Sequence, residues 1–432
     1  LHYKRTKYDF LLFEITKKMT FCFLCGINIY IGGMELKKGI IRIFVLLTCI
    51  LLCLSITGCK NKNYQSFSKT IKYNELDNTD KKMLSELNKV LYKSKAVIWQ
   101  DLDLKQRPLL LVRKDESDDK GNKTNKDISY FAININGIED ENVKKVNMPK
   151  GFYFDSVYRF NNVEDYLSAL NSNYSSKDDE LNIAKSQNVF YFKYNSKSFN
   201  NEEYSNEAFS AMFTKQAFNY YIQKDWPKYD NPVSVGLTAN ELSYIGVEYK
   251  IMDNIRKECN KDNVNVNKLN TLISEYVTVE KEREKLNETY IKDEREKITY
   301  EGSAFYVAIR AARLTETPYN LIFFGEDNEE KETAFYNTFT KMSKDEIPAT
   351  YVSEQSLYSI GAQLCIMLNN LDINGWQKEI NASYEDNVVT IYDVIHKYYE
   401  DNKLKEKSID DVKEKYDYDE ILKEAKKIQR LL

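Results

Sequence analysis

The hydrophobic pattern of this chain changes its period near residue 200, and this change constrains the fold more than any other feature. Before that point, short aliphatic and aromatic runs are separated by turn residues, as in β-strands. From about residue 203, apolar residues recur with the 3.6-residue period of amphipathic helices. The sequence therefore predicts an α+β fold, with an N-terminal, mostly antiparallel sheet followed by a helical C-terminal part.

The same patterns predict the individual elements. A first helix is expected at 79–95, and strands are expected at 96–99, 108–113, 129–135, 151–154 and 188–194. Residues 114–127 are almost wholly polar and are expected to form a surface loop. Further helices are expected at 203–224, 238–260, 265–314, 329–344, 353–371, 388–401 and 408–431. We therefore expect a sheet-bearing part at 75–200 and a helical part at 201–432. The charge-dense segment 270–300 is interpreted as a solvated helix face.

Residues 34–58 have the organisation of a bacterial signal peptide. A basic start holds Lys37, Lys38 and Arg42, and an apolar run follows from residue 43 to residue 56. This run is shorter than the roughly 20 residues that a transmembrane helix needs. The run ends in Ile56-Thr57-Gly58-Cys59, which resembles the lipobox of bacterial lipoproteins. The resemblance implies that Cys59 is lipidated and holds the protein on the extracytoplasmic face of the cell membrane.

The segments on either side of this signal follow from it. Residues 1–33 precede a complete signal peptide and are interpreted as an upstream over-extension of the reading frame. Residues 59–74 are expected to be the tether between lipid and fold. Cleavage before Cys59 removes eight basic and three acidic residues, which leaves a net charge near −9. We expect an acidic domain tethered to the membrane surface.

Composition excludes several kinds of site. The 62 Lys and Arg nearly balance the 66 Asp and Glu, which gives no reason to expect nucleic acid as a partner. Of the two histidines, His2 lies before the signal peptide, so a mature chain would keep His396 alone and could not form a two-histidine zinc site. We interpret His396 as structural. Cys259 and Cys365 either pair in a disulfide or remain two separate core thiols.

Two segments of the helical part carry the most specific pattern in the chain. The first is Lys215-Gln216-Ala217-Phe218-Asn219-Tyr220-Tyr221-Ile222-Gln223, followed by Trp226-Pro227. The second is Tyr300-Glu301-Gly302-Ser303-Ala304-Phe305-Tyr306-Val307. In this order they resemble two motifs of the gluzincin-type zincin metallopeptidases, in which the first helix runs like HEAFHYYVQ before a Trp-Pro and the second like YEGxAxYV.

The resemblance implies a zincin-like fold that has lost its zinc. In that family two histidines of HExxH bind the metal, the glutamate between them polarises water, and a later glutamate is the third ligand. Here the histidine positions hold Lys215 and Asn219, and the general-base position holds Gln216. Only Glu301 matches the family, at the third-ligand position. The resemblance therefore implies no bound metal, no cofactor and no catalytic residue.

The helical period adds an argument about Lys215 and Asn219. Both lie on a stripe that is otherwise apolar, and a buried lysine is rare unless it is paired. We hypothesise that the Lys215 ammonium stands where the metal would be and that the Glu301 carboxylate is its partner. In the alternative, Lys215 extends to solvent and Glu301 pairs elsewhere.

These observations predict a membrane-anchored lipoprotein with a catalytically inactive metallopeptidase-like domain, a pseudopeptidase that binds a peptide or an envelope component. Two alternatives remain. The first is a solute-binding lipoprotein of a transporter, although that class usually has repeated βα units in two lobes. The second is a hydrolase with an unconventional, carboxylate-only metal site that uses Glu207, Glu301 and other acidic residues.

Overall fold

We describe the protein from a computed structural model. It describes residues 69–119, 122–138, 143–160, 188–199, 208–317, 335–384 and 387–432, together with residues 170, 172–176, 181–184, 186 and 319. The chain divides into two compact units, residues 1–66 and 67–432, and only the second contains described residues. The signal peptide, the lipidation position Cys59 and Glu207 lie outside the described residues.

The sheet is mixed, with three antiparallel and two parallel pairings among the described strands. Its strand order is β1-β4-β5-β3-β2-β6. The three central pairings are antiparallel, but each edge strand runs parallel to its neighbour. Parallel neighbours require long connections, and α3 (Asn78–Lys93) lies within the one that joins β1 to β4. The strands are β1 (Lys69–Lys72), β2 (Leu109–Asp119), β3 (Asn122–Ile133), β4 (Val143–Asn147), β5 (Val157–Phe160) and β6 (Phe190–Tyr194).

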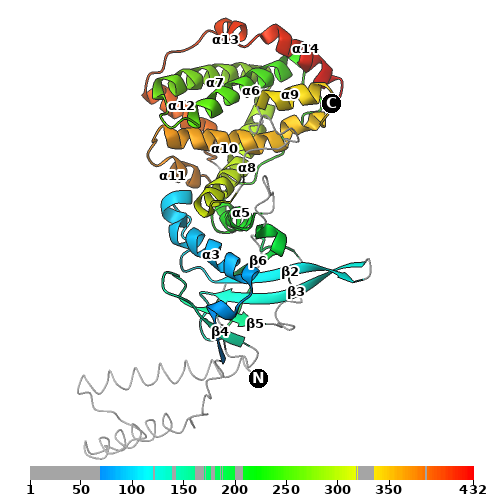
Figure 1. The fold of residues 1–432 in the computed structure, drawn as a ribbon. Coiled ribbons are helices and arrows are strands. Elements are labelled where there is room, and N and C mark those ends of the chain that lie inside the picture. Colours follow the sequence, from blue (N-terminus) through cyan, green and yellow to red (C-terminus); the bar gives the residue numbers. More distant parts are fainter. Residues whose placement is uncertain are drawn as a thin grey trace, which may run out of the picture. The chain divides into compact units, whose positions relative to one another are not determined.

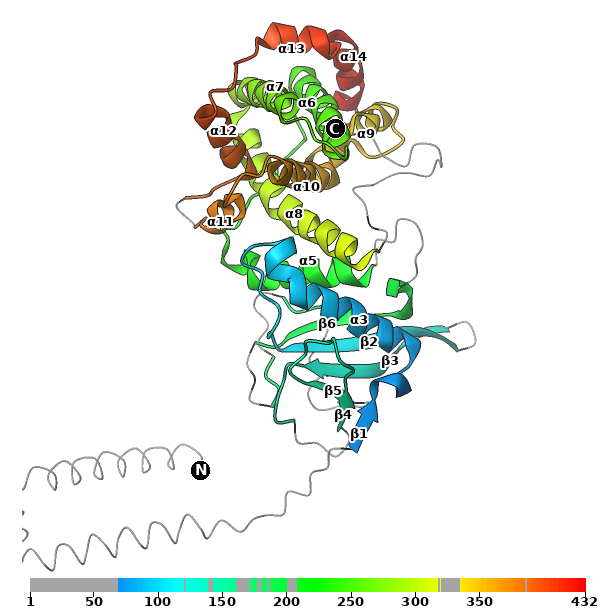
Figure 2. The same ribbon diagram turned by 60° about the vertical axis from the view of Figure 1, so that its left-hand side comes forward.

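Both faces of the sheet are buried, as the side-chain alternation along the strands requires. Leu109, Leu111 and Phe131 belong to the main core, whereas Leu110 and Val112 belong to a smaller core on the opposite face. α3 and α5 (Phe209–Tyr221) lie over the first face, and both views show them side by side there (Figures 1 and 2). The sheet therefore supports α5, which carries the first motif segment.

The helical part is built around α8 (Glu288–Thr315), a helix of 28 residues. α8 packs against α5 on one side and against α10 (Gln355–Asn370) on the other (Figure 2). A Cβ atom added at Gly302 of α8 would lie 2.4 Å from the Cα atom of Gly361 in α10. The two helices can therefore approach this closely only because both positions are glycine. The remaining helices are α6 (Ala239–Cys259), α7 (Val266–Leu286), α9 (Phe335–Ser343), α11 (Trp376–Asn381), α12 (Ile391–Asp401), α13 (Ile409–Lys415) and α14 (Tyr418–Gln429).

Several predictions of strands and of irregular segments before residue 155 are wrong. Residues 96–99 are not a strand, because Ser94–Ile98 forms a π-helical turn that the Trp99 N–H closes on the Ser94 carbonyl. Residues 151–154 are irregular and lie between β4 and β5, which the sequence did not reveal. Most of the expected loop 114–127 instead belongs to β2 and β3. β1 lies within the expected tether 59–74, so its four residues belong to the sheet.

Two helices expected to be continuous are interrupted. The expected helix 265–314 breaks at Asn287, whose side chain accepts a hydrogen bond from the Tyr290 N–H and caps α8. The expected helix 408–431 breaks between α13 and α14, where Asp417 takes a left-handed conformation with φ +56°. A short helix, α11, was not expected. Cys259 and Cys365 are free thiols.

Candidate functional site

The four positions singled out by the motif resemblance lie on two helices that pack against each other. Lys215, Gln216 and Asn219 are on α5, and Glu301 is on α8. The Lys215 ammonium lies 5.5 Å from the ring centre of Tyr358, on α10. Lys215 and Glu301, which are 86 residues apart in sequence, therefore come to one place beside a third helix.

Lys215 is partly buried and has no direct acidic partner in the described part of the chain. Burial lowers the pKa of Lys215, and the nearby carboxylate of Glu301 offsets part of this effect. Among the described residues, however, no carboxylate oxygen lies within 4.0 Å of its Nζ atom. Lys215 and Glu301 thus interact electrostatically without forming a contact ion pair, and the nearest described partner of the ammonium is the face of the Tyr358 ring.

Glu301 lies among tyrosines and a second lysine. Its Oε1 atom accepts a hydrogen bond of 2.9 Å from the Tyr229 hydroxyl. Burial raises the pKa of Tyr229, and the Glu301 charge raises it further. The same two causes, in the same order, raise the pKa of Tyr358 to about 12. Lys297 also interacts electrostatically with Glu301, which offsets the lowering of the Lys297 pKa by burial. Two lysines therefore flank one carboxylate.

Lys297 is held in place by neutral groups. It is 6% exposed, and its Nζ atom donates hydrogen bonds to the Asn231 side chain at 2.9 Å and to the Ser353 carbonyl at 3.0 Å. It lies four residues before Glu301 on α8, which places both on one face of the helix. Neither Lys297 nor Tyr229 was predicted from the motif segments. The helical spacing could have identified Lys297, but no local pattern points to Tyr229.

Two amide side chains, Asn219 on α5 and Gln223 just after that helix, leave unused hydrogen-bond acceptors. The Oδ1 atom of Asn219 and the Oε1 atom of Gln223 are buried, and neither has a partner among the described residues. The Gln223 amide nitrogen donates to the Tyr300 carbonyl at 2.6 Å. Gln216 is 7% exposed. Buried acceptors are nearly always satisfied in folded proteins, so these two oxygens are the exceptions at this place.

Several other residues of the two motif segments pack in the core. The Trp226 ring packs edge-on against Phe218 at 5.8 Å and against Tyr300 at 6.0 Å. Tyr306 packs edge-on against Trp99 at 6.3 Å. These aromatic residues join both segments to the core, while Gly302 allows the contact with α10.

The chemistry available at this place differs from that of a zinc hydrolase. An amide such as Gln216 cannot take a proton from water, and an ammonium cannot be a metal ligand. Across the described residues, no group of three or more His, Cys, Asp or Glu side chains could hold a metal ion. The site provides one carboxylate, two amines and several hydroxyl and amide groups, a set suited to hydrogen bonding with a polar ligand.

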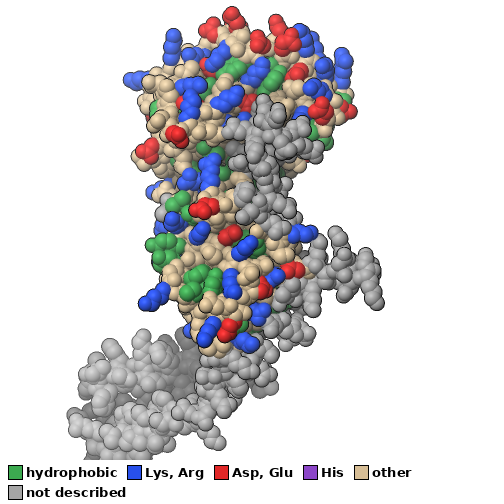
Figure 3. Space-filling model, viewed as in Figure 1, with side chains coloured by type: hydrophobic (Ala, Val, Ile, Leu, Met, Phe, Trp, Pro, Cys, Tyr) green, Lys and Arg blue, Asp and Glu red, His purple; other side chains and the backbone are tan. Residues whose placement is uncertain are grey.

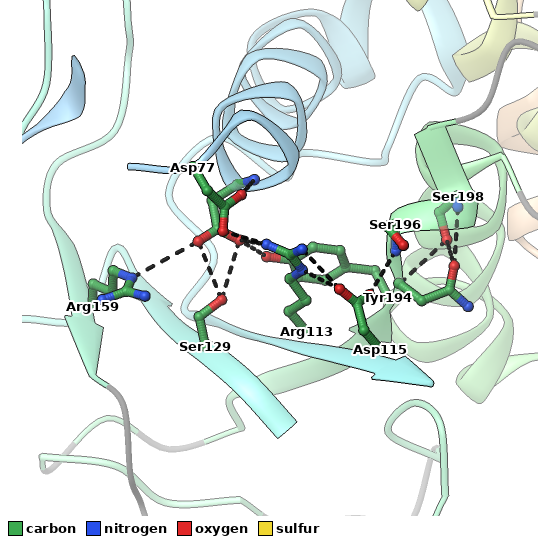
Figure 4. Close-up of polar contacts among 10 residues, drawn as sticks. Asp77, Arg113, Asp115, Ser129, Arg159, Tyr194, Ser196 and Ser198 are labelled. Carbon is green, nitrogen blue, oxygen red and sulfur yellow. Dashed lines mark hydrogen bonds and ion pairs between the residues drawn. The ribbon is translucent and has the colours of Figure 1, made fainter. Parts of the chain in front are cut away.

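A separate polar cluster, which the sequence analysis missed, joins α3 to the sheet (Figure 4). Asp80 is fully buried and accepts hydrogen bonds from Ser129 at 3.1 Å and from Tyr194 at 3.0 Å. Figure 4 shows Arg113 between Asp77 and Asp115, and it bonds to both. Burial raises the pKa of Asp80, and the hydrogen bonds and Arg113 counteract this. Because its partners are complete, we interpret this cluster as structural.

The charge pattern predicted that segment 270–300 is a solvated helix face, and this prediction is wrong. Arg283 is 3% exposed and bonds to Glu248, Glu280 and Glu294, which are also buried. Arg295 bonds to Glu280 at 2.8 Å. The network therefore joins α6, α7 and α8 in the core. His396 lies 3.7 Å from Glu400 and packs beside Tyr392 and Tyr399, which agrees with a structural role.

Comparison with known proteins adds no assignment. No family model, no curated protein and no solved structure matches this chain. Within the described residues, no helix is both long enough and apolar enough to cross a membrane.

Proposed function

We propose that this protein is a lipid-anchored, extracytoplasmic lipoprotein whose folded part is a catalytically inactive relative of the gluzincin metallopeptidases. In this proposal it binds a peptide or another envelope component and does not cleave it. The observation that carries the proposal is the packing of α5 against α8, which brings the Lys215 and Glu301 positions of the two motif segments within electrostatic reach of each other.

The chemistry of the site supports binding rather than hydrolysis. A lone carboxylate between packed helices would be costly to bury, and Lys215 and Lys297 provide the compensating positive charge.

The decisive experiment restores the family's metal ligands. The triple variant Lys215→His, Gln216→Glu, Asn219→His rebuilds HExxH opposite Glu301. We expect the wild-type chain to hold no stoichiometric zinc by elemental analysis and the triple variant to hold one zinc per chain. The matched control adds Glu301→Gln to the triple variant and should lose most of this zinc, because the third ligand is removed.

Two results would overturn the proposal. One is stoichiometric zinc in the wild-type protein together with chelator-sensitive cleavage of a general peptidase substrate. The other is a folded triple variant that fails to bind zinc, because the two segments would then not have the geometry of a zincin site.

The lipid anchor is tested separately at Cys59. In producing cells, the wild-type chain should incorporate a labelled fatty acid and fractionate with the membrane. Cys59→Ala should abolish the labelling and release the protein, because no acyl chain remains to be buried in the bilayer. Membrane association that persists unchanged in Cys59→Ala would contradict this part of the proposal.

A further inference from the structure

A pocket of about 280 Å³ opens where the π-helical turn after α3 meets α8, the end of α10 and the start of α11. Its lining includes none of the four positions discussed above, so the inference below is independent of the proposed function. Three aromatic rings form its floor, Trp99, Tyr306 and Trp376, and they pack edge-on at centroid distances of 5.2 to 6.3 Å.

Hydrogen bonds fix this floor. The indole N–H of Trp99 donates to Asn381 at 3.1 Å, and that of Trp376 donates to Asn369 at 3.4 Å. The amide nitrogen of Asn369 in turn donates to the Tyr306 hydroxyl at 2.7 Å. Because each ring is held by packing and by its polar atom, the floor is preorganised and a ligand would not have to order it.

Arg310 gives the pocket a fixed positive group. Its Nε and Nη2 atoms donate to the Val97 carbonyl at 3.1 and 2.8 Å, and its guanidinium lies 6.0 Å from the Tyr306 ring centre. These two bonds leave Nη1 uncommitted among the described residues, where no carboxylate lies within 4.0 Å of Arg310. Burial first, and repulsion by the Arg310 charge second, lower the pKa of Arg313, so the two guanidinium groups lie close enough to repel each other.

Asp372 brings an acidic group to the same pocket. It lies in the loop between α10 and α11, in a left-handed conformation with φ +51°, and its side chain is exposed. No ion pair or side-chain hydrogen bond holds its carboxylate within the described part of the chain. The side chains of Gln100 and Asn374 add amide donors and acceptors to the lining.

We propose that this pocket binds a small zwitterion, a free amino acid or a dipeptide, with its carboxylate on Arg310 and its ammonium on Asp372. A guanidinium is the side chain best suited to pair with a carboxylate in two parallel hydrogen bonds. The volume lies just below the range of about 300–1,000 Å³ typical of drug-sized ligands, which fits a smaller molecule. The mainly polar wall excludes a purely apolar ligand.

The experiment varies the ligand and the protein together. Binding to the full chain is measured by titration calorimetry with the twenty free amino acids and their alanyl dipeptides, each also in C-amidated and N-acetylated form. We expect at least one free form to bind. C-amidation and Arg310→Gln should each weaken binding at least tenfold, and their effects should not add, because both remove the same contact. N-acetylation and Asp372→Asn should likewise each weaken binding at least tenfold, and their effects should not add, because both remove the contact of the ligand ammonium.

A matched control separates this contact from general electrostatics. Lys95 also lines the pocket, but its side chain is 64% exposed and lies 3.9 Å from Asp103. Lys95→Gln removes the same charge as Arg310→Gln and should change the dissociation constant less than twofold. Asn tolerates the left-handed conformation of residue 372, so Asp372→Asn should fold.

Three results would overturn the inference. The first is that no free form binds at millimolar concentrations. The second is that Arg310→Gln and C-amidation weaken binding additively. The third is that C-amidation weakens binding while N-acetylation does not, which would mean an anion site rather than a zwitterion site. The titrations with free, C-amidated and N-acetylated ligands use the wild-type chain. They therefore test the zwitterion site even if Arg310→Gln fails to fold.

Discussion

The contact between Gly302 and Gly361 allows a quantitative test of how α8 and α10 pack. In Gly302→Ala the new methyl group would lie 2.4 Å from the Gly361 Cα atom, 2.7 Å from its carbonyl carbon and 3.0 Å from the Ala362 nitrogen. All three are backbone atoms, which cannot rotate away. An ordinary contact of 3.4 Å requires the helices to move apart by about 1 Å, the difference between that distance and the first of these. A gap of that size forfeits roughly a quarter to a half of the dispersion energy of the atom pairs that it separates.

The expected magnitude follows from two opposing terms. Replacing glycine by alanine inside a helix gains about 1 kcal/mol in propensity. Overpacking costs about 1–3 kcal/mol, and contact with a second backbone places this position at the upper end. We therefore expect Gly302→Ala to lose about 2 kcal/mol of stability, the difference between about 3 and about 1.

Urea unfolding followed by tryptophan emission measures this loss. The three tryptophans of the chain lie together beside α8, with Trp99 5.2 Å from Trp376 and 6.4 Å from Trp226. The matched control is Gly246→Ala on α6, where the three atoms nearest the new methyl group belong to the side chains of Ile421 and Phe339 and not to a second backbone. The control should lose less than Gly302→Ala. The reasoning is refuted if Gly302→Ala is as stable as the wild type or more stable.

Three further variants test charges buried in the core. Burial lowers the folded pKa of Lys215 more than Glu301 raises it, so wild-type stability rises with pH between the folded and unfolded pKa values of this lysine. Lys215→Met should lose that rise in urea titrations at several pH values, and a rise that persists in the variant would contradict this. Burial raises the pKa of Glu86 from 4.5 to about 7. Wild-type stability should therefore fall as the pH rises between those two values, by up to about 1.4 kcal/mol per pKa unit. Glu86→Gln should remove this fall. Equal stability of Glu86→Gln and wild type at pH 8 would contradict this. Arg283→Met should lose about 3–5 kcal/mol because it leaves buried carboxylates unpaired, and a loss below about 1 kcal/mol would show that they are solvated.

The helices were predictable from the sequence to the extent that one face of each is apolar. The expected helices at 79–95, 238–260 and 353–371 correspond to α3, α6 and α10 with small shifts at their ends. The expected strand at 96–99 shows the limit of this argument. Ala96-Val97-Ile98-Trp99 is a short apolar run, and such a run can be a buried strand or a buried helical turn. The choice depends on the partners of Trp99, which are distant in sequence.

The buried ion network could not have been predicted, for a related reason. Glu280 and Arg283 have the spacing of a surface pair on a helix, and nothing local distinguishes a solvated pair from a buried one. What places Arg283 in the core is Glu248, 35 residues earlier on another helix. In the candidate site, likewise, the sequence analysis named Lys215 and Glu301 but not Tyr229, which bonds to Glu301 from 72 residues away.

The order of the elements along the chain has a consequence for biosynthesis. The six strands of the described residues lie within residues 69–194, so each of them has been translated before any residue of α5 to α14. At about 5–20 residues per second, the 27 residues from the end of β6 to the end of α5 take roughly 1–5 s to make, which is long compared with the formation of a β-hairpin. During that time α3 alone among the helices of the described residues can cover the main-core face, and the apolar side chains of β6 that later contact α5 remain exposed. The nascent chain therefore passes through a stage in which Phe190 and Phe192 are accessible to a chaperone, and that stage ends when α5 emerges.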